Sequence, residues 1–332
     1  MRDLRQLPKA NLHLHLTGSM RPATLAELAA RAGLSVPPPL PEGVAHGWEA
    51  FQERYDTARS AVRTSDDVMR VIRETIADSA ADGAAWVEIQ IDPTSYASRL
   101  GGEAAVVETA LAAADGRAGI VLASSWAGTP ETATRIATLA ARYQPHGVVG
   151  FGLSNDERRG RVADFARAFR IAADVGLLAV PHAGFYEAAW HVRDCVEQLG
   201  AKRIGHGLTA AADPVTLGFL AERGVTLEVC PTSYPPFGMS LPLASLIEAG
   251  VPVALGTDDP LLFGADLSTQ YAIARRLGLD DAALAQLARH SIEASTAPPA
   301  LRASMLAGVD AWLGSLGERG DRGERGEREI PG

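Results

Sequence analysis

Cysteine is scarce in this chain, which holds only two in 332 residues, Cys195 and Cys230. Two cysteines cannot form the disulfide framework that stabilises small secreted proteins. We interpret Cys230 as a small buried hydrophobic residue rather than a reactive thiol. The scarcity is typical of proteins in a reducing compartment, so we expect a cytoplasmic location.

A surplus of basic charge is also missing. The chain has 31 Lys and Arg against 40 Asp and Glu, which gives a net charge of −9. Proteins that bind nucleic acid polymers carry a basic patch or stripe. We therefore expect no nucleic acid polymer as a partner, and a small-molecule substrate fits the composition better.

Long apolar runs are absent as well. No stretch is long enough to cross a bilayer, and the first ten residues, MRDLRQLPKA, lack the apolar core of a signal peptide. We expect no membrane partner. The hydrophobic content of 47% still allows one large buried core, so we expect a single domain. The composition leaves the oligomeric state open.

Short apolar segments typical of strands recur eight times and alternate with helical windows. They cover residues 10–16, 86–91, 120–124, 148–153, 177–181, 203–206, 225–229 and 251–256. This alternation predicts an α/β fold of the TIM (β/α)8 barrel type. An open doubly wound sheet is the alternative, but no Gly-rich phosphate-binding fingerprint follows the first strand.

Helical patterns over residues 22–33, 48–61 and 65–82 predict a helical insertion after the first strand. We expect the insertion, residues 22–83, to cap the mouth of a single barrel domain formed by residues 1–316. Residues 317–332 are charged and Gly-rich without an apolar stripe, so we expect a disordered tail.

Histidines stand at three of the predicted strand ends. His13 and His15 are two residues apart, so on a strand both side chains point to the same face. His182 follows the fifth strand, and His206 ends the sixth strand between two glycines. Because the carboxyl ends of barrel strands converge on one mouth, we expect these imidazoles to lie close together.

Two adjacent carboxylates, Asp258 and Asp259, follow the eighth strand. Adjacent side chains point in different directions, so one can bind a metal while the other reaches water or substrate. A helix cap is the alternative role for either. With three of the histidines, one carboxylate completes a ligand set that suits zinc and leaves a position for water; other divalent metals accept similar ligands.

Six short segments lie in order over residues 11–263: NLHLHLTGS, VVGFGLSNDE, PHAG, RIGHG, LEVCPTS and GTDDPLLF. In this order and at this spacing they resemble the adenosine deaminase family of zinc aminohydrolases. The resemblance implies one Zn²⁺ per chain, with the ligands His13, His15, His182 and Asp258. It also implies that His206 acts as base and electrostatic partner of the attacking hydroxide, which Asp259 orients.

One position departs from the family in a way that affects the chemistry. The family places a Glu directly after the HAG segment, where it protonates the ring nitrogen beside the reacting carbon, and this chain has Phe185. General acid catalysis contributes roughly 10²- to 10⁴-fold in rate, so deamination of adenosine by the ordinary route should be crippled. Glu187 either bends back to supply the proton or opens the following helix, where a carboxylate complements the helix dipole.

Further departures point to a reshaped pocket. Thr17 stands where adenosine-specific members carry an acid that holds the ribose, and Asn155 occupies a position near which the family usually has a small residue that offers its backbone amide to the purine. Tyr234 adds aromatic bulk after the seventh strand. We expect Thr17, Asn155, Gly184, Phe185 and Tyr234 to contact the substrate. Glu157 either caps a helix or lines the mouth.

Three hypotheses about function follow. The first is a zinc-dependent aminohydrolase of the adenosine deaminase type that acts on a purine-like or other aminated heterocycle or nucleoside, but not on plain adenosine. The second is a zinc hydrolase or lyase of another reaction class on the same scaffold. The third is a non-catalytic, deaminase-like binding protein, which has no physical need to keep both His206 and Asp259.

Overall fold

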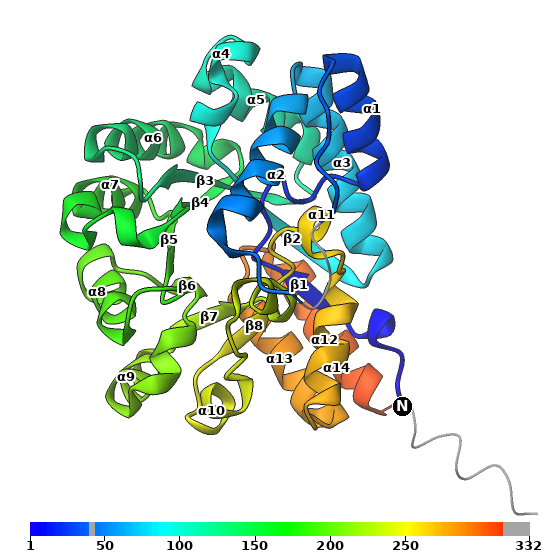
Figure 1. Cartoon of the computed structure of the whole chain (residues 1–332). Coiled ribbons are helices and arrows are strands. Elements are labelled where there is room, and N and C mark those ends of the chain that lie inside the picture. The colour runs from blue at the N-terminus through cyan, green and yellow to red at the C-terminus, as the bar shows by residue number, and fades with distance from the viewer. Residues whose placement is uncertain (40–43, 315–332) are drawn as a thin grey trace, which may run out of the picture.

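Eight parallel strands, in the spatial order β1 to β8, form the centre of this computed structural model (Figure 1). The structure describes residues 1–39 and 44–314. The strands are β1 Lys9–Asn11, β2 Ala84–Ile91, β3 Gly119–Ser125, β4 Val148–Ser154, β5 Leu178–Ala183, β6 Arg203–His206, β7 Thr226–Val229 and β8 Val253–Leu255. A parallel bridge between Leu14 and Asp258 closes the sheet between its first and last strands. The predicted (β/α)8 barrel is confirmed, and the open sheet is not found.

Two of the differences from the predicted strand limits change where site residues lie. The first regular strand ends at Asn11 instead of residue 16, and the chain then makes isolated bridges from Leu14 to Asp258 and from His15 to Gln90. The backbone after Asn11 therefore leaves the regular ladder with β2 and makes only single bridges to its two neighbours. The fifth strand extends to Ala183, so His182 lies within it rather than in the turn that follows.

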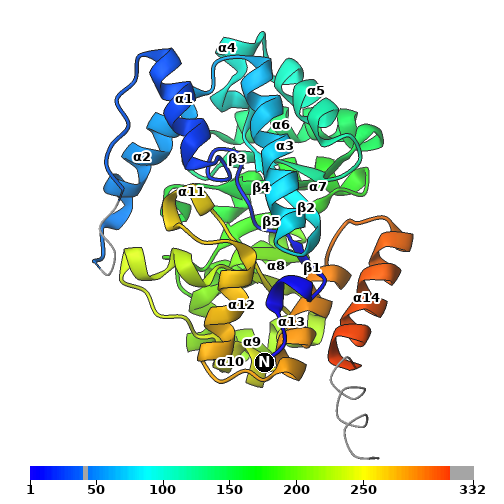
Figure 2. The same cartoon turned by 90° about the vertical axis from the view of Figure 1, so that its right-hand side faces the viewer.

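Helices cover the outside of the barrel (Figures 1 and 2). They are α3 Ser65–Ala81, α5 Glu103–Ala114, α6 Pro130–Tyr143, α7 Val162–Asp174, α8 Ala189–Leu199, α9 Pro214–Arg223, α10 Leu243–Glu248, α12 Leu267–Arg276, α13 Asp281–Glu293 and α14 Pro299–Gly314. The strands are thus buried on both faces, which explains why they read as continuous apolar runs. The helix α14 lies beside the amino-terminal segment, where Trp312 Nε1 donates to the Asp3 carbonyl at 2.8 Å.

Polar residues at the helix starts explain where several helices begin. Thr64 and Asp67 form a reciprocal capping box at α3, in which each side chain accepts from the backbone of the other residue. Thr129 and Asp213 cap α6 and α9, and each is followed by a proline at the first helical position. Proline is tolerated there because its missing N–H has no intrahelical partner anyway.

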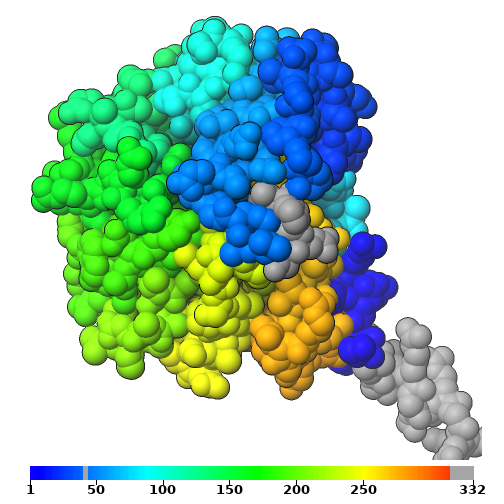
Figure 3. Space-filling model, in the orientation of Figure 1, coloured from blue at the N-terminus to red at the C-terminus, as the bar shows by residue number. Residues whose placement is uncertain are grey.

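Four helices lie near the mouth: α1 Pro22–Ala32, α2 Gly47–Ala61, α4 Ala97–Leu100 and α11 Pro260–Phe263. Two helices of the predicted cap lie over the mouth: α2 crosses its centre, and α1 packs against α2 (Figures 1 and 3). The third helix, α3, instead packs on the outside of the barrel against β2 and α5. The predicted disordered tail, residues 317–332, lies outside the described residues. Among the described residues, no helix combines the length and apolar character needed to cross a membrane.

Candidate metal centre and active site

The strand ends bring four histidines and two carboxylates to one place. His13 and His15 follow β1, His182 lies in β5 opposite Gly205, and His206 ends β6. Asp258 and Asp259 follow β8, and the Asp258 amide donates to the His13 carbonyl at 2.9 Å. The predicted site residues from strands one, five, six and eight therefore meet, as the barrel topology requires.

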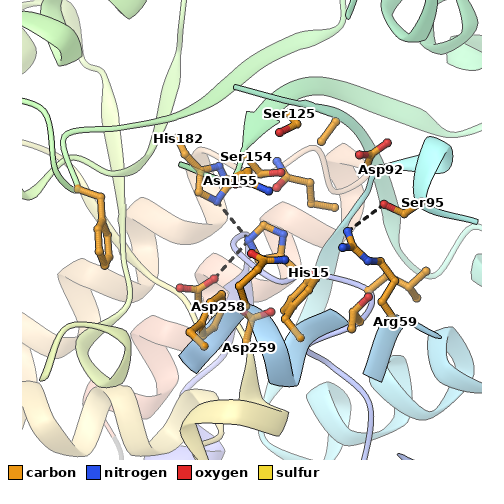
Figure 4. A pocket seen from close by; sticks show the side chains of 18 of the residues that line it. His15, Arg59, Asp92, Ser95, Ser125, Ser154, Asn155, His182, Asp258 and Asp259 are labelled. Carbon is orange, nitrogen blue, oxygen red and sulfur yellow. Dashed lines mark hydrogen bonds and ion pairs between the residues drawn. The ribbon is translucent and has the colours of Figure 1, made fainter. Parts of the chain in front are cut away.

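The side-chain atoms of four of these residues converge. His15 Nε2 lies 3.2 Å from His182 Nε2 and 3.2 Å from Asp258 Oδ1 (Figure 4). His13 Nε2 lies 3.5 Å from the same oxygen. His13 Nε2 is buried and has no hydrogen-bond partner. Three imidazole nitrogens and one carboxylate oxygen at this separation are a donor set that a divalent metal ion such as zinc would fit.

Glycines make this close approach possible. A Cβ atom at Gly205 would lie 2.8 Å from Cε1 of His13, and one at Gly256 would lie 2.7 Å from its Cβ. A Cβ atom at Gly18 would overlap Asp259, at 1.7 Å from Oδ1. The glycines of the segments LTGS, RIGHG and LGTDD are therefore needed for space around the ligands.

Backbone strain gathers at the same place. His206, Asp258 and Asn155 have positive φ angles of 69°, 57° and 74°. Residues with a side chain rarely adopt this left-handed region, and such strain persists only where the surrounding structure enforces it. The strained backbone turns these side chains toward the mouth and is a mark of a functional site.

Burial and neighbouring charges shift the pKa values of three side chains at the site. Burial, and next the neighbouring His13, lower the pKa of His206 to about 3, so its imidazole is neutral at pH 7. Burial, reinforced by Asp258, raises the pKa of Asp259 well above its usual value. Burial lowers the pKa of His13, but the neighbouring carboxylates of Asp258 and Glu228 outweigh it and raise this pKa to about 10. Burial thus favours the uncharged form of both His206 and Asp259.

A chain of buried charges runs beneath His13 and was not foreseen from the sequence. Glu228 Oε2 lies 2.9 Å from His13 Nδ1, and Glu228 Oε1 lies 2.7 Å from Arg203 Nε. Arg203 also donates to Glu88 at 2.6 Å, and all of these side chains are at most 2% exposed. The available signal was a charged residue inside each of three apolar strands, β2, β6 and β7.

A cavity opens beside the candidate metal ligands. One side is aromatic and consists of Trp48, Phe51, Tyr55, Phe185, Tyr186, Phe237 and Phe263. The other side is polar and includes Gln90, Asp92, Ser95, Ser125, Ser154, Asn155 and Arg59 (Figure 4). At the polar side Arg59 donates to Ser95 Oγ at 3.1 Å. Such a cavity fits a flat ring with a hydrophilic substituent.

The predicted substrate contacts are placed differently. Thr17, Asn155 and Phe185 line the cavity, and the Thr17 hydroxyl shares a 2.5 Å hydrogen bond with Tyr96. Gly184 and Tyr234 are buried outside its lining, although the Tyr234 ring lies 5.9 Å from that of His206. Gly184 and Tyr234 therefore lie behind the residues that line the cavity.

The alternative proton donor, Glu187, is also outside the cavity lining. Its backbone amide donates to Glu157 at 2.6 Å, and its carbonyl accepts from Thr209 at 2.7 Å. Glu157, in contrast, lines the cavity and is buried. Of the two roles left open for Glu157, the structure shows the position at the mouth. The side chain that caps the 3₁₀ turn Glu157–Arg159 is that of Asp156.

Comparison with known proteins gives consistent matches. The model of the adenosine deaminase family matches residues 8–312. A Streptomyces virginiae protein named putative adenosine/adenine deaminase is 49% identical over 333 residues, covering 94% of this chain and 98% of that protein. The aminodeoxyfutalosine deaminase of Streptomyces coelicolor is 37% identical, covering 93% and 86%. The crystal structure of adenine deaminase from Arthrobacter aurescens superposes with a TM-score of 0.82 at 26% identity, covering 92% of this chain and 99% of that one.

Proposed function

The chain belongs to the adenosine deaminase family and is a hydrolytic deaminase, and from this premise we propose a zinc-dependent aminohydrolase whose substrate is not plain adenosine. The substrate is a purine-like or other aminated heterocycle or nucleoside. The single observation that carries this proposal is Phe185, whose ring lines the cavity 4.8 Å from the ring of His206. A cytoplasmic location is part of the proposal, since both cysteines are free thiols.

The convergent donor set supports the assignment of the metal ligands. His13, His15 and His182 would each offer Nε2, and Asp258 would offer Oδ1. A zinc ion held there would lower the pKa of a water molecule enough to supply a nucleophile at neutral pH. Glu228 accepts from His13 Nδ1 and so directs the lone pair of Nε2 toward the ion.

His206 and Asp259 would handle the protons. His206 is neutral at pH 7, so it can accept a proton from the attacking water. Asp259 Oδ1 is buried without a hydrogen-bond partner and can orient that water. Water adds to the ring carbon that bears the amino group, the C–N bond breaks, and the nitrogen leaves as ammonia with the relayed proton.

The phenyl ring of Phe185 cannot donate a proton to the ring nitrogen beside the reacting carbon. A missing general acid slows such a reaction by roughly 10²- to 10⁴-fold. The proposed substrate therefore has a ring that accepts the nucleophile without this help, or receives the proton from water. The relatives named for adenosine, adenine and aminodeoxyfutalosine indicate the compounds to test first.

The first experiment measures ammonia release by the zinc-loaded protein from adenosine, deoxyadenosine, adenine, aminodeoxyfutalosine, cytidine and guanine. We expect rapid release from one compound other than adenosine, and His206→Ala should abolish it. Phe185→Glu should raise the rate with adenosine by about 10² or more, whereas the control Phe185→Leu, which adds no carboxylate, should not. Rapid adenosine release by the unmodified protein, or activity that survives His206→Ala, would contradict the proposal.

A second reaction class is favoured by the same residue. Phe185 replaces the acid that deamination of a purine uses and leaves the metal-binding residues and His206 in place. A zinc hydrolase or lyase that needs no ring protonation would keep this arrangement. It would release no ammonia from the whole panel, while a zinc-dependent reaction would appear with another substrate class.

A further inference from the structure

The carboxylate of Glu157 binds three consecutive backbone amides. The residue follows β4 in a short 3₁₀ turn, Glu157–Arg159, and its side chain is 2% exposed. Its Oε1 accepts from the N–H groups of Phe185, Tyr186 and Glu187 at 2.9, 2.6 and 2.6 Å. Successive N–H groups that converge on one anion form a strong binding nest, and hydrogen bonds to a charged acceptor are about twice as strong as neutral ones.

The second oxygen of Glu157 faces a buried imidazole. Oε2 lies 3.6 Å from Nδ1 of His191 on α8, and the two side chains are 2% and 1% exposed. The His191 ring packs 5.1 Å from Trp126, whose Nε1 donates to the His182 carbonyl at 2.9 Å. Glu157 therefore connects the end of β4 with the turn after β5 and with the helix α8.

The turn that Glu157 binds, residues 185–187, is also fixed at its two ends. Gly184 has a φ of +69°, and a Cβ atom there would lie 2.5 Å from Cγ2 of Val192, so the chain can leave β5 in this direction only with glycine. At the other end Thr209 Oγ1 donates to the Glu187 carbonyl at 2.7 Å. In between, Glu157 is the acceptor for the three amides.

This turn presents Phe185 and Tyr186 to the cavity, and Phe185 is the one that packs against His206. The Phe185 ring lies 4.8 Å from the His206 ring and 5.3 Å from the Phe237 ring. In the proposed reaction His206 works at the reacting carbon, so the phenyl ring would form the wall beside that carbon. A methyl group on the substrate ring atom next to the amino-bearing carbon would then meet this wall.

We propose that Glu157 is a positioning residue for substrate selection: it fixes the turn 185–187 so that Phe185 excludes substrates that are substituted on the ring nitrogen next to the amino-bearing carbon. This inference rests on the proposed function. Glu157 acts through Phe185 and does not touch the reacting atoms. Loss of its carboxylate leaves three amides without an acceptor, and the turn relaxes together with its phenyl ring.

Hydrogen exchange tests the structural half on the zinc-loaded, full-length protein without any substrate. In Glu157→Ala the amides of residues 185–187 should exchange at least about ten-fold faster, while α8 stays protected and the zinc content is unchanged. Glu157→Gln keeps a carbonyl acceptor and should show a smaller increase. The matched control is Glu197→Ala, because Glu197 lies exposed on α8 and pairs with Arg193 instead of the turn; its exchange at 185–187 should equal that of the unmodified protein.

A double-mutant cycle tests the functional half. The ratio of kcat/KM between the best substrate and its ring-N-methylated analogue should fall about ten-fold in Glu157→Ala and in Phe185→Ala. If Glu157 acts through Phe185, the double variant should show no further fall. A residue that only stabilises the fold would lower kcat/KM for both substrates alike and leave the ratio unchanged.

Two results would overturn the proposal: amides 185–187 that stay protected in both Glu157→Ala and Glu157→Gln, or selectivity effects of Glu157→Ala and Phe185→Ala that simply add. If Glu157→Ala does not fold, Glu157→Gln replaces it in both measurements. Failure of the proposed function is distinct, because the unmodified protein would then release no ammonia from any compound. In that case the exchange measurement alone decides whether Glu157 fixes the turn.

Discussion

At the scale of single residues, the contact between Glu228 and His13 orients an imidazole that we propose as a metal ligand. Glu228 accepts from Nδ1 of His13, which leaves Nε2 directed at the other ligand atoms. Partners of this kind typically contribute 10- to 100-fold to metal affinity. The carboxylate is itself held by Arg203, so its position does not depend on solvent.

The first prediction follows from this contact. Glu228→Gln keeps the size of the side chain but removes its charge, so His13 loses its strong acceptor and Arg203 loses one of two carboxylates. We expect zinc affinity to fall by about 10- to 100-fold, and the free energy of unfolding to fall by about 3 kcal/mol because a buried pair is broken. Competition with a chromogenic chelator and urea unfolding measure the two effects.

Glu88→Gln is the matched control. It removes the other carboxylate bound to Arg203 but has no contact with His13. Its effect on stability should be similar, and its effect on zinc affinity should be within about three-fold of the unmodified protein. Equal losses of zinc affinity in both variants would mean that Glu228 acts only through the buried charge network and not by positioning His13.

The residues around the metal centre show what sequence reasoning can reach. The spacing of His13 and His15 and their place at a strand end were enough to predict that they meet His182 and Asp258. The contact of Glu228 with His13 and that of Glu157 with Phe185 were not predicted, because each joins groups more than 25 positions apart in the sequence. Only the fold determines such pairs, and a charged residue within an apolar strand is the one local signal.

At the scale of elements, the helix α2 is held over the mouth by aromatic contacts. Phe51 on α2 stacks on Phe263 at a centroid distance of 5.8 Å, and it also meets Phe237 at 5.5 Å. These two partners lie in the loops after β8 and β7. Phe51 is 8% exposed and lines the cavity, so it contributes both to docking of the helix and to the shape of the pocket.

The second prediction concerns this helix. Phe51→Ala removes the central contact between α2 and the two loops, so substrate should bind more weakly and KM should rise by about ten-fold, with kcat changed much less. A buried Phe→Ala substitution also lowers the free energy of unfolding by about 3 kcal/mol. Steady-state kinetics with the substrate identified by ammonia release, together with thermal unfolding, measure both effects.

Phe219→Ala on α9 provides the comparison for that variant. Phe219 is partly buried and packs under Arg193 and Arg223, away from the cavity. It should lower stability without changing KM. A KM that stays constant in Phe51→Ala would show that α2 does not take part in substrate binding.

The elements themselves were predictable to a large extent, and the reasons differ from one to another. Strands buried on both faces, such as β3 and β4, gave apolar runs that the structure reproduces within two residues. The first strand was predicted too long, because the alternation of ANLHLHL continues after the backbone has left the ladder at Asn11. The docking of α2 was not derivable, since it depends on loops after two distant strands.

At the scale of the whole molecule, the proposed metal centre lies where the barrel closes. Asp258 is bridged to Leu14, and Asn11 Nδ2 donates to Thr257 Oγ1 at 2.8 Å across the same junction between the first and last strands. The proposed ligands come from the beginning, middle and end of the barrel. A metal ion bound by them would therefore link segments that are more than 240 residues apart in the chain.

The third prediction is that zinc contributes to the stability of the whole barrel. An ion that binds only the folded chain stabilises it by about 4 kcal/mol when its free concentration is a thousand times Kd. For a chain of this size that corresponds to roughly 6 °C in Tm. Removing zinc with a chelator should lower Tm by this amount, and adding zinc back should restore it.

Two variants show whether the effect comes from the proposed ligands. His13→Ala should contain no zinc, and its Tm should no longer respond to the chelator, because the ligand set is incomplete. His146→Ala carries the same substitution at an exposed position after α6 and should behave like the unmodified protein. Full zinc content in His13→Ala would overturn the ligand assignment. A chelator effect on Tm that persists in a zinc-free His13→Ala would place the stabilising metal ion elsewhere in the molecule.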